Sequence, residues 1–370
     1  MRIALVHDYL KEYGGAERVL EVLHELFPKA PLYTIVYLPS FLGPHKIRFV
    51  NWNIKPSGAQ LLPFKQKLIS PLRLLAPIFF KSFDFSSYDL IIVSATGAYN
   101  PNIIDKKNAK LICYYHTPPR YLYGYPTARK LSNNKVIKSL TVLANHFLRL
   151  IDFKSSQNVD MFIANSYEVK GRIAKFYRKD AVVVYPPVDL PHVKLKSKKE
   201  NFFVAGGRLA MPKNIHIIID ACTKLNLPLK VFGKSFAGYG ETLKKIAGSN
   251  VEFLGEISDE QKWDLLSKGR AFIFASADED FGIVPVEAMG AGIPVIAYRS
   301  GGVMESVIEG QTGMFFDKPD AASLMETLVE FEKKKFSALK CRAQAEKFSK
   351  QIFKNKILKI VDEVVAKNNV

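Results

Sequence analysis

Cysteine is scarce in this sequence, and the three cysteines at positions 113, 222 and 341 lie far apart. Their spacing matches neither a metal site nor a redox pair. A signal-peptide pattern is also missing, because Met1-Arg2 leads directly into strand-like residues. We therefore expect a reducing, cytosolic setting for this chain.

Negative charge is in deficit. The sequence has 35 Asp and Glu residues against 53 Lys and Arg residues, which gives a net charge of +18. Such a balance indicates an anionic partner, namely nucleic acid, a phosphorylated substrate or an acidic membrane surface. No zinc-finger, basic-zipper or RNA-recognition motif is present, so we expect no nucleic-acid partner. Phosphates and lipid head groups remain.

Long uninterrupted apolar runs are missing as well. The most apolar stretch, residues 61–80, carries Lys65, Lys67 and Arg73. Inserting three charges into a bilayer would be opposed by roughly 8–10 kcal/mol, so this segment is not predicted to span a membrane. Two interpretations stay open. The segment lies on a membrane surface with its lysines at the head groups, or it packs on the core with a solvated basic face.

The sequence predicts an α/β protein with two domains. At 370 residues it is too long for one ordinary core. Strand-like apolar runs alternate with helical stretches from residue 2 onward and again from residue 202 onward, which is typical of mostly parallel, doubly wound, Rossmann-like sheets. We place a first domain at 1–186, a linker at 187–200, a second domain at 201–350 and a C-terminal helix at 351–370.

One strand–turn–helix segment stands out in the second half. Residues 278–288 read DEDFGIVPVEA and follow the apolar run 271–275. Ligands bind to α/β sheets at such turns. Phe281, Gly282 and Ile283 can present backbone N–H groups at the helix N-terminus, where partial positive charge favours an anion.

Carboxylates bracket this turn. Glu279 lies in the turn and Glu287 about one helical turn into the helix, so both could face one ligand and accept hydrogen bonds from a sugar diol. The alternative is that these acids serve the helix macrodipole. Asp278 and Asp280 also form a D-x-D pattern, which can hold a divalent cation on a diphosphate. We expect no metal, because a cationic pair elsewhere offers the same charge compensation.

A glycine pair follows the first strand of each half, and in the second half basic residues come directly after it. Arg208 and Lys213 share one loop after Gly206-Gly207, where the guanidinium can bridge two phosphate oxygens and the ammonium adds a compact charge. Gly14-Gly15 opens a helix, and glycines there let a backbone approach a phosphate closely. The G-x-G-x-x-G dinucleotide spacing is missing. A basic surface loop and a plain tight turn are the respective alternatives.

Polar residues also mark the ends of strands in the first half. His116 ends an apolar strand, and a polar residue at the carboxyl end of a sheet strand is expected to reach the ligand site. The alternative is a structural histidine. Asn165 and Ser166 are predicted to be helix caps, and Asn165 has capping-box spacing to Glu168. Asp8 and Glu17 are polar residues close to the same edge, without an assigned role.

Together these residues resemble the retaining glycosyltransferases with the GT-B fold, of the group-one (family-four) type that includes bacterial O-antigen mannosyltransferases. The likeness covers nearly the whole chain. Its motifs are Gly14-Gly15-Ala16-Glu17, His116-Thr117-Pro118-Pro119, Asn165-Ser166, Gly207-Arg208 with Lys213, Glu279 to Glu287, and Gly301-Gly302-Val303-Met304-Glu305. The spaced glutamates together with the upstream Arg and Lys are its most specific part.

The resemblance implies two Rossmann-like domains that face each other across a cleft, the first for the acceptor and the second for a nucleotide sugar. It implies that the C-terminal helix packs back on the first domain. The implied reaction is metal-independent sugar transfer with retained anomeric configuration, from GDP-mannose ahead of a UDP-sugar, and without a resident cofactor. The implied acceptor is a lipid-linked glycan or polysaccharide. We expect a cytoplasmic location, with peripheral attachment to an anionic inner membrane face as an open option.

Residue roles follow from the same resemblance. The residues at the reacting sugar and the leaving diphosphate would be His116, Arg208, Lys213 and Glu279. The residues that bind the donor would be Gly14, Gly15, Phe281, Gly282, Ile283 and Glu287. Two alternative functions stay open: a nucleotide-sugar epimerase, which shares this architecture, and a non-catalytic sugar- or lipid-binding protein.

Overall fold

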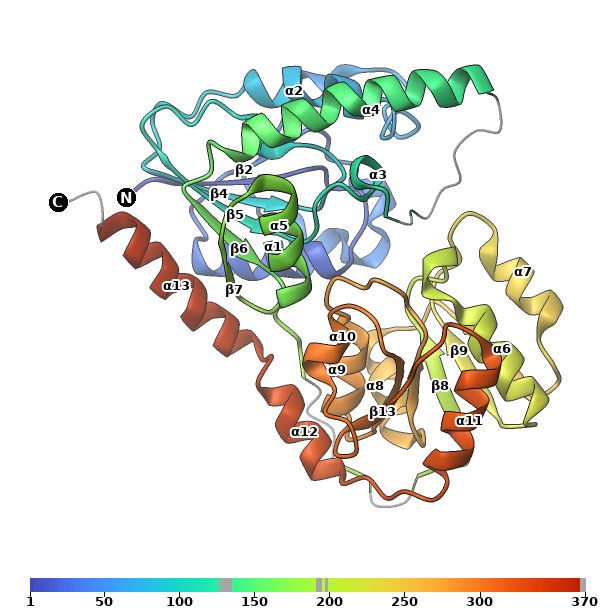
Figure 1. The fold of residues 1–370 in the computed structure, drawn as a ribbon. Coiled ribbons are helices and arrows are strands. Elements are labelled where there is room, and N and C mark those ends of the chain that lie inside the picture. Colours follow the sequence, from blue (N-terminus) through green and yellow to red (C-terminus); the bar gives the residue numbers. More distant parts are fainter. Residues whose placement is uncertain (126, 128–134, 191–194, 197–198, 367–370) are drawn as a thin grey trace. The chain divides into compact units, whose positions relative to one another are not determined.

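The computed structural model describes residues 1–125, 127, 135–190, 195–196 and 199–366. The chain divides into two units (Figure 1). Unit 1 contains the described residues of 1–125, 135–187 and 350–366, and unit 2 contains residue 127 and the described residues of 188–349.

The described residues of unit 1 form a seven-stranded parallel sheet in the order β3-β2-β1-β4-β5-β6-β7. Its strands are β1 (Ile3–His7), β2 (Leu32–Thr34), β3 (Ile54–Pro56), β4 (Leu90–Ala95), β5 (Lys110–Tyr115), β6 (Met161–Ala164) and β7 (Ala181–Val183). Every residue of β4 is buried, as expected for a parallel strand covered on both faces. The sheet order reverses between β1 and β4, and ligands bind outside the carboxyl ends of strands at such a switch point.

Helices flank this sheet. In the described part of unit 1 they are α1 (Gly15–Leu26), α2 (Leu72–Lys81), α3 (Arg120–Tyr123), α4 (Lys135–Ser156), α5 (Tyr167–Tyr177) and α13 (Lys350–Ala366), with the 3-10 turns η1 (Pro39–Phe41), η2 (Gly43–Phe49), η3 (Gly58–Leu61) and η4 (Pro101–Ile103). α13 packs against α1, because Phe353 and Ile357 share a buried cluster with Leu23. Lys350 Nζ also donates to Glu25 Oε1 at 2.6 Å. The expected return of the C-terminal helix onto the first half of the chain is confirmed.

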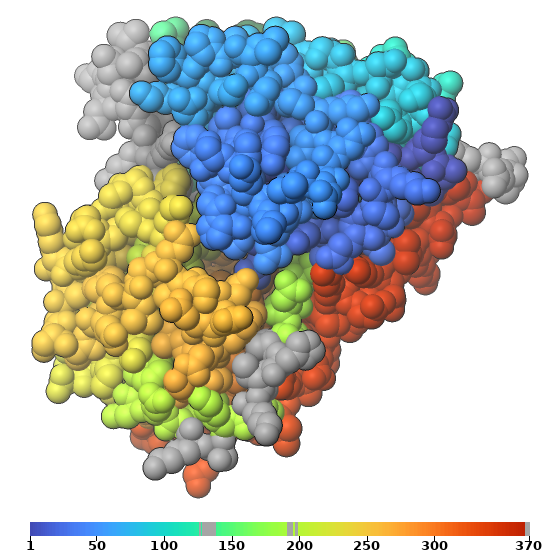
Figure 2. All heavy atoms as spheres, turned by 180° about the vertical axis from the view of Figure 1, so that it is seen from behind, coloured from blue at the N-terminus to red at the C-terminus, as the bar shows by residue number. Residues whose placement is uncertain are grey.

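The apolar segment 61–80 does not form one helix. Residues 62–71 run mostly as turns, and α2 begins only at Leu72. Leu72, Ala76 and Phe80 face the core of unit 1. The light-blue atoms of this part of the chain form an outer surface of unit 1 in Figure 2. No helix of the described residues is long and apolar enough to cross a bilayer.

The described residues of unit 2 form a six-stranded parallel sheet in the order β10-β9-β8-β11-β12-β13. Its strands are β8 (Phe203–Gly206), β9 (Leu229–Phe232), β10 (Val251–Gly255), β11 (Phe272–Phe274), β12 (Val295–Tyr298) and β13 (Gly313–Phe316). The helical elements here are η5 (Met211–Lys213), α6 (Ile215–Lys224), α7 (Tyr239–Ile246), α8 (Asp259–Lys268), α9 (Ile283–Gly290), α10 (Val303–Ser306), α11 (Ala321–Phe331) and α12 (Ala338–Glu346). The order reverses between β8 and β11, so the loops after these strands meet at a second switch point. The predicted α/β class, with a doubly wound parallel sheet in each half, is confirmed.

A buried carboxylate anchors α4 to its neighbours in unit 1. Asp152 Oδ2 accepts hydrogen bonds from Tyr123 Oη of α3 at 2.8 Å and from Tyr177 Oη of α5 at 2.9 Å. Burial raises the pKa of this carboxyl to about 6, although both tyrosines favour its charged form. The folded state therefore disfavours the charged carboxylate, and this group lowers the free energy of unfolding as the pH rises from about 4 to about 6.

Asp152→Asn should remove this pH dependence, because the amide still accepts from the tyrosines but cannot ionise. One pKa unit corresponds to about 1.4 kcal/mol, so the stability of the variant relative to the native chain should rise by up to about 3 kcal/mol between pH 4 and pH 7. Urea unfolding at both pH values measures this difference. The exposed residue Asp362 of α13 offers Asp362→Asn as the control. A stability difference between Asp152→Asn and the native chain that is the same at pH 4 and at pH 7 would contradict the prediction.

Candidate functional site

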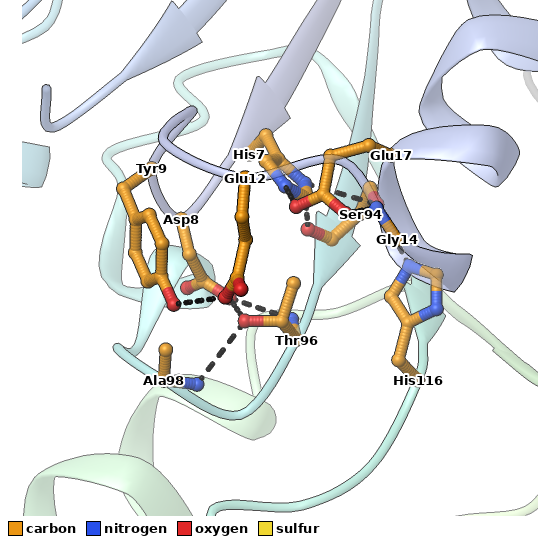
Figure 3. Close-up of polar contacts among 10 residues, drawn as sticks. All are labelled: His7, Asp8, Tyr9, Glu12, Gly14, Glu17, Ser94, Thr96, Ala98 and His116. Carbon is orange, nitrogen blue, oxygen red and sulfur yellow. Dashed lines mark hydrogen bonds and ion pairs between the residues drawn. The ribbon is translucent and has the colours of Figure 1, made fainter. Parts of the chain in front are cut away.

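The carboxyl edge of the unit 1 sheet gathers polar side chains at its switch point (Figure 3). His7 ends β1, Ser94 lies near the end of β4, and His116 follows β5. His7 Nδ1 lies 2.9 Å from the Ser94 carbonyl oxygen and 3.2 Å from Ser94 Oγ, which in turn lies 2.9 Å from His116 Nε2. All three side chains are buried, and these contacts connect them in one chain of hydrogen bonds.

These hydrogen bonds determine where the protons lie. A carbonyl oxygen only accepts, so His7 Nδ1 carries a proton. The Ser94 hydroxyl then cannot donate to His7, and we assign its proton to the hydrogen bond with His116 Nε2. Burial, and then the charge of His7, lower the pKa of His116 to about 3, so this ring is neutral at pH 7. A neutral ring that accepts at Nε2 carries its proton at Nδ1.

His7 has the opposite electrostatic character. Its Nε2 lies 3.6 Å from Glu17 Oε1 of α1. Burial opposes the charged ring, yet the contact with Glu17 and the charge of Asp8 raise the pKa of His7 above its ordinary value of 6.5. Through His7 and Ser94, an anionic residue on α1 is thus coupled to the neutral ring of His116.

Asp8 follows β1 and is fully buried. Its Oδ2 accepts hydrogen bonds from Thr96 N at 2.6 Å and from Thr96 Oγ1 at 2.5 Å. Its Oδ1 has no hydrogen-bond partner among the described residues, and burial raises the pKa of this carboxyl. A buried acceptor without a partner costs about 1–3 kcal/mol. Such groups are concentrated where a protein binds or transforms a ligand.

The two glycines of the predicted phosphate turn lie at the start of α1. Gly14 is its N-cap, with φ −146° and ψ −154°, an extended conformation that any residue can adopt. The Gly14 N–H donates to Glu17 Oε2 at 2.8 Å and thereby closes the cap, and Gly15 is the first residue of the helix. Special backbone freedom of glycine is therefore not what forms this turn.

Of the two predicted helix caps, Ser166 is confirmed and Asn165 is wrong. Ser166 caps α5, since its Oγ accepts from the backbone N–H three residues later at 3.0 Å. Asn165 Nδ2 donates instead to the His116 carbonyl oxygen at 2.9 Å, and Glu168, the expected capping partner, pairs with Arg172. Asn165 therefore holds the segment that carries His116.

In unit 2, the loops after β8 and β11 carry a lysine–glutamate ion pair. Lys213 Nζ contacts Glu279 Oε2, and Ser276 Oγ donates to the same oxygen at 2.6 Å. Asn214 Nδ2 donates to the Ala275 carbonyl oxygen at 3.1 Å and ties the two loops together. Two predicted site residues, Lys213 and Glu279, thus meet at the unit 2 switch point.

The backbone around Glu279 is unusual. Asp278 has φ +50°, a left-handed conformation that is rare outside glycine, and its N–H donates to Ser300 Oγ at 3.0 Å. A Cβ on Gly301 would lie 2.4 Å from the Glu279 carbonyl oxygen, so this position requires glycine. Gly302 N donates to the same carbonyl oxygen at 2.8 Å. Backbone strain of this kind is typical of functional sites.

The predicted turn Phe281-Gly282-Ile283 forms the start of α9. Gly282 is the N-cap, with φ +86°, and Ile283 is the first helical residue. The ring of Phe281 is buried and packs against Phe348, which fixes the loop on the core of unit 2. The backbone N–H groups of the first turn of α9 follow Glu279 in the sequence. They lie at the positive end of the helix dipole.

Glu287 of α9 is buried and paired with Lys262 of α8. Glu287 Oε1 accepts from Lys262 Nζ at 2.9 Å, and the two side chains expose only 1% and 8% of their surface. Lys262 Nζ also donates to Asp259 Oδ1 at 3.0 Å. A carboxylate accepts several hydrogen bonds at once, so pairing with Lys262 is compatible with a ligand hydroxyl. Sequence reasoning did not single out Lys262.

Arg208 lies in the same loop as Lys213, and its side chain is exposed. The guanidinium carbon lies 5.8 Å from the centroid of the Phe236 ring. No group of three or more His, Cys, Asp or Glu side chains in the described part of the chain is arranged to hold a metal ion. The site in unit 2 therefore combines exposed and half-buried cations with two glutamates, which suits an anionic ligand that also carries hydroxyl groups.

Ser94→Ala should release His116 from its single tautomer, because Nε2 loses the hydroxyl that donates to it. Leaving this buried acceptor unpaired should lower the free energy of unfolding by about 1–3 kcal/mol. Ring ¹⁵N NMR of the chain labelled at its seven histidines distinguishes Nδ1–H from Nε2–H. Ser306→Ala, at a buried serine of unit 2, is the matched control. An Nε2–H ring in the native chain would contradict the assignment.

Two family models match the chain. Residues 189–350 match the model of glycosyl transferases group 1, and residues 13–191 match the model of glycosyltransferase family 4. Together the two models extend over both halves of the chain.

Curated relatives carry similar descriptions. An uncharacterized glycosyltransferase of Methanocaldococcus jannaschii is 28% identical over 241 residues, which cover 62% of this chain and 67% of that protein. The O-antigen chain mannosyltransferase RfbU of Salmonella typhimurium is 36% identical over 216 residues, which cover 48% of this chain and 60% of that protein. The chain thus matches about two thirds or less of the length of these relatives.

Solved structures resemble the whole chain. Sucrose-phosphate synthase from Thermosynechococcus elongatus has a TM-score of 0.72 at 16% identity, covering 99% of this chain and 100% of that one. The Anabaena protein HepE in complex with UDP has a TM-score of 0.69 at 20% identity, covering 98% and 100%. At these identities the likeness shows the fold alone.

Proposed function

Because the chain belongs to the group 1 glycosyltransferases, we propose that it transfers mannose from GDP-mannose to a hydroxyl group of a lipid-linked glycan. We further propose that the anomeric configuration is retained and that no metal ion takes part. Enzymes of this family use nucleotide sugar donors. The likeness to an O-antigen chain mannosyltransferase supports mannose as the sugar.

The observation that carries the proposal is the Lys213–Glu279 pair at the unit 2 switch point. In the proposed complex, Arg208 and Lys213 bind the diphosphate, and the freed Glu279 carboxylate accepts from hydroxyls of the sugar. The first turn of α9 adds backbone N–H donors and the positive end of its dipole, through Phe281-Gly282-Ile283. One site thereby meets both the charge and the hydroxyl groups of a nucleotide sugar.

Glu287 and Lys262 complete the donor site in this proposal. Glu287 would accept hydrogen bonds from the ribose hydroxyls. Lys262 Nζ, 2.9 Å from Glu287 Oε1, holds the orientation of this buried carboxylate. Lys262 is thus a positioning residue, because it acts through Glu287.

Bond making and bond breaking would occur on one face of the sugar. The acceptor hydroxyl forms the new bond to the anomeric carbon, while the bond from that carbon to the diphosphate oxygen breaks and its electrons leave with the diphosphate. The leaving phosphate oxygen takes the hydroxyl proton. Negative charge develops on the diphosphate, and the cations of Arg208 and Lys213 stabilise it.

The unit 1 edge would serve the acceptor. His116 is neutral at pH 7 and carries its proton at Nδ1, so it can donate a hydrogen bond to a sugar oxygen without adding charge. A donor contact by Gly14, in contrast, would require its N–H to leave Glu17. We place the reaction at the cytoplasmic face of the inner membrane, where the net charge of +18 favours an anionic surface.

A thermal-shift series with GDP-mannose, GDP, UDP-glucose and UDP-galactose tests the donor. A true donor at 100 times its Kd should stabilise the folded chain by about 2.7 kcal/mol, so GDP-mannose should raise Tm and the UDP-sugars should not. Turnover is then measured with GDP-mannose and a lipid-linked glycan in the presence of EDTA. Full activity in EDTA is expected, and activity restored only by manganese or magnesium would contradict the metal-free mechanism.

Other outcomes of the same experiment separate the alternatives. Conversion of the donor sugar without an acceptor would identify an epimerase. Stabilisation by a nucleotide sugar without turnover of any glycan acceptor would identify a binding protein. If only the UDP-sugars raise Tm, the donor is a UDP-sugar and not GDP-mannose. The proposal of glycosyl transfer would then still stand.

A further inference from the structure

Unit 1 carries an exposed apolar surface that the proposed reaction does not use. Eleven of the 24 exposed large hydrophobic side chains among the described residues lie in two segments, 61–78 and 140–153. They are Leu61, Phe64, Leu74, Leu75, Ile78, Leu140, Val142, Leu143, Phe147, Leu150 and Phe153, and we call them the α2–α4 face. Exposed apolar patches of this extent mark sites of interaction.

α4 differs from an ordinary surface helix, because it carries an apolar stripe on its exposed face. Its exposed stripe consists of Leu140, Leu143, Phe147 and Leu150, each 55–61% exposed and spaced by three or four residues. Among the α4 side chains whose burial is described, Asp152, Ser155 and Ser156 are fully buried, and Leu148 and Ile151 are half-buried. A helix that served only the core would carry polar residues on its outer face. The stripe of α4 therefore faces a partner outside the core of unit 1.

α2 and α4 contribute to the same face. Both helices pack against η4, and both lie along the same edge of unit 1 in Figure 1. The Arg73 guanidinium of α2 lies 4.3 Å from the ring centroid of Tyr121, whose carbonyl oxygen accepts from Asn145 Nδ2 of α4 at 3.4 Å. Through η4 and Tyr121, these contacts make α2 and α4 neighbours in unit 1.

The charge of this face is positive. The sequence has no Asp or Glu between residues 57 and 83, and the only acid of α4, Asp152, is buried. Exposed basic side chains on the two segments and their flanks are Lys67, Lys81, Lys138, Arg149 and Lys154. Apolar side chains flanked by lysine and arginine are typical of a surface that lies in the head-group region of an anionic bilayer.

We propose that the α2–α4 face lies on the surface of an anionic lipid bilayer. A second copy of this chain fits the face poorly, because it would bring two positive surfaces together in a chain of net charge +18. No helix in the described ranges could cross the bilayer, so attachment would be peripheral. The proposal names the surface for the membrane placement proposed above, and it does not rest on the proposed reaction, since attachment to lipid needs neither the donor nor the acceptor.

Vesicle flotation of the full chain tests this proposal. The probes are vesicles of phosphatidylcholine alone and of phosphatidylcholine with 30% phosphatidylglycerol. The native chain should bind the anionic vesicles at least tenfold more tightly than the neutral ones. Leu143→Gln with Phe147→Gln should weaken binding at least tenfold, because the polar amides replace apolar side chains at exposed helix positions. Replacing Lys67, Lys138 and Lys154 by Gln should weaken binding to the anionic vesicles by about fivefold per lysine.

The matched control is Val329→Gln with Leu339→Gln, at exposed apolar positions of α11 and α12 in unit 2, and it should bind like the native chain. Equal binding by the control and by the α4 variant would overturn the proposal, as would a native chain that does not float with anionic vesicles. A native dimer in light scattering that dissociates in the α4 variant would replace the bilayer with a second copy. Flotation does not depend on turnover, so this proposal and that of the donor can fail separately.

Discussion

Glu287→Leu is expected to destabilise unit 2 by about 3 kcal/mol, because it leaves the Lys262 ammonium buried without its main partner. Lys262 is only 8% exposed, and its other contact, Asp259, lies at the surface. The exposed Lys224–Asp220 pair of α6 supplies the control, since Lys224→Met should change stability by less than about 1 kcal/mol. Urea unfolding measures both effects.

The double variant Lys262→Met with Glu287→Leu separates structure from function. An apolar pair of similar volume is often as stable as a buried ion pair, so this variant should recover most of the lost stability. It should nevertheless fail to bind GDP and should lose at least a hundredfold in kcat/KM, since no carboxylate remains for the ribose. A double variant that folds and turns over like the native chain would show that Glu287 has a structural role only.

The fold could be predicted from the sequence because parallel strands buried on both faces read as short apolar runs. Residues 90–95 and 271–275 are such runs, and the glycine-rich or polar turn after each strand marks the carboxyl edge. Lys213 and Glu279 could be placed near each other by the same reasoning, because both follow strands next to the switch point of one sheet.

Other features required the tertiary structure. Lys262 lies 25 residues before Glu287 on a different helix, and the sequence around it shows only the Ser258–Gln261 capping box of α8. Asn165 and Ser166 could both be expected to cap a helix. Only the structure shows that the Asn165 amide donates to the His116 carbonyl oxygen instead. For α4, the spacing of apolar residues indicates a stripe, but spacing does not tell which face of a helix is turned to the core.

The hydrogen bonds of His7 could not be predicted from the sequence either. It ends β1 as part of a buried run, and nothing in the local sequence connects it to Ser94, which is 87 residues away. Sheet order brings the two strands side by side. The proton arrangement of His116 therefore depends on long-range pairing of strands, which a motif search cannot supply.

Lys213→Ala is expected to lower kcat by about three orders of magnitude. A cation about 4 Å from the leaving diphosphate is worth at most about 4 kcal/mol at an effective dielectric near 20, and this contribution grows as charge develops in the transition state. Arg208→Ala should cause a loss of similar size in kcat/KM. Lys213→Arg keeps the charge but not the compact geometry, so it should retain part of the activity.

A lysine outside the proposed diphosphate site provides the control for these variants. Lys234 follows β9 in the same unit and lies 3.6 Å from Glu256, and Lys234→Ala should leave kcat unchanged. Steady-state kinetics should assign the Lys213→Ala loss mainly to kcat, because the interaction strengthens in the transition state, whereas loss of ground-state binding alone would raise KM. Native kcat in both the Arg208→Ala and Lys213→Ala variants, with folding intact, would show that this loop does not bind the diphosphate. The Lys213–Glu279 pair would then be a structural ion pair, and the donor site would have to be sought elsewhere in the chain.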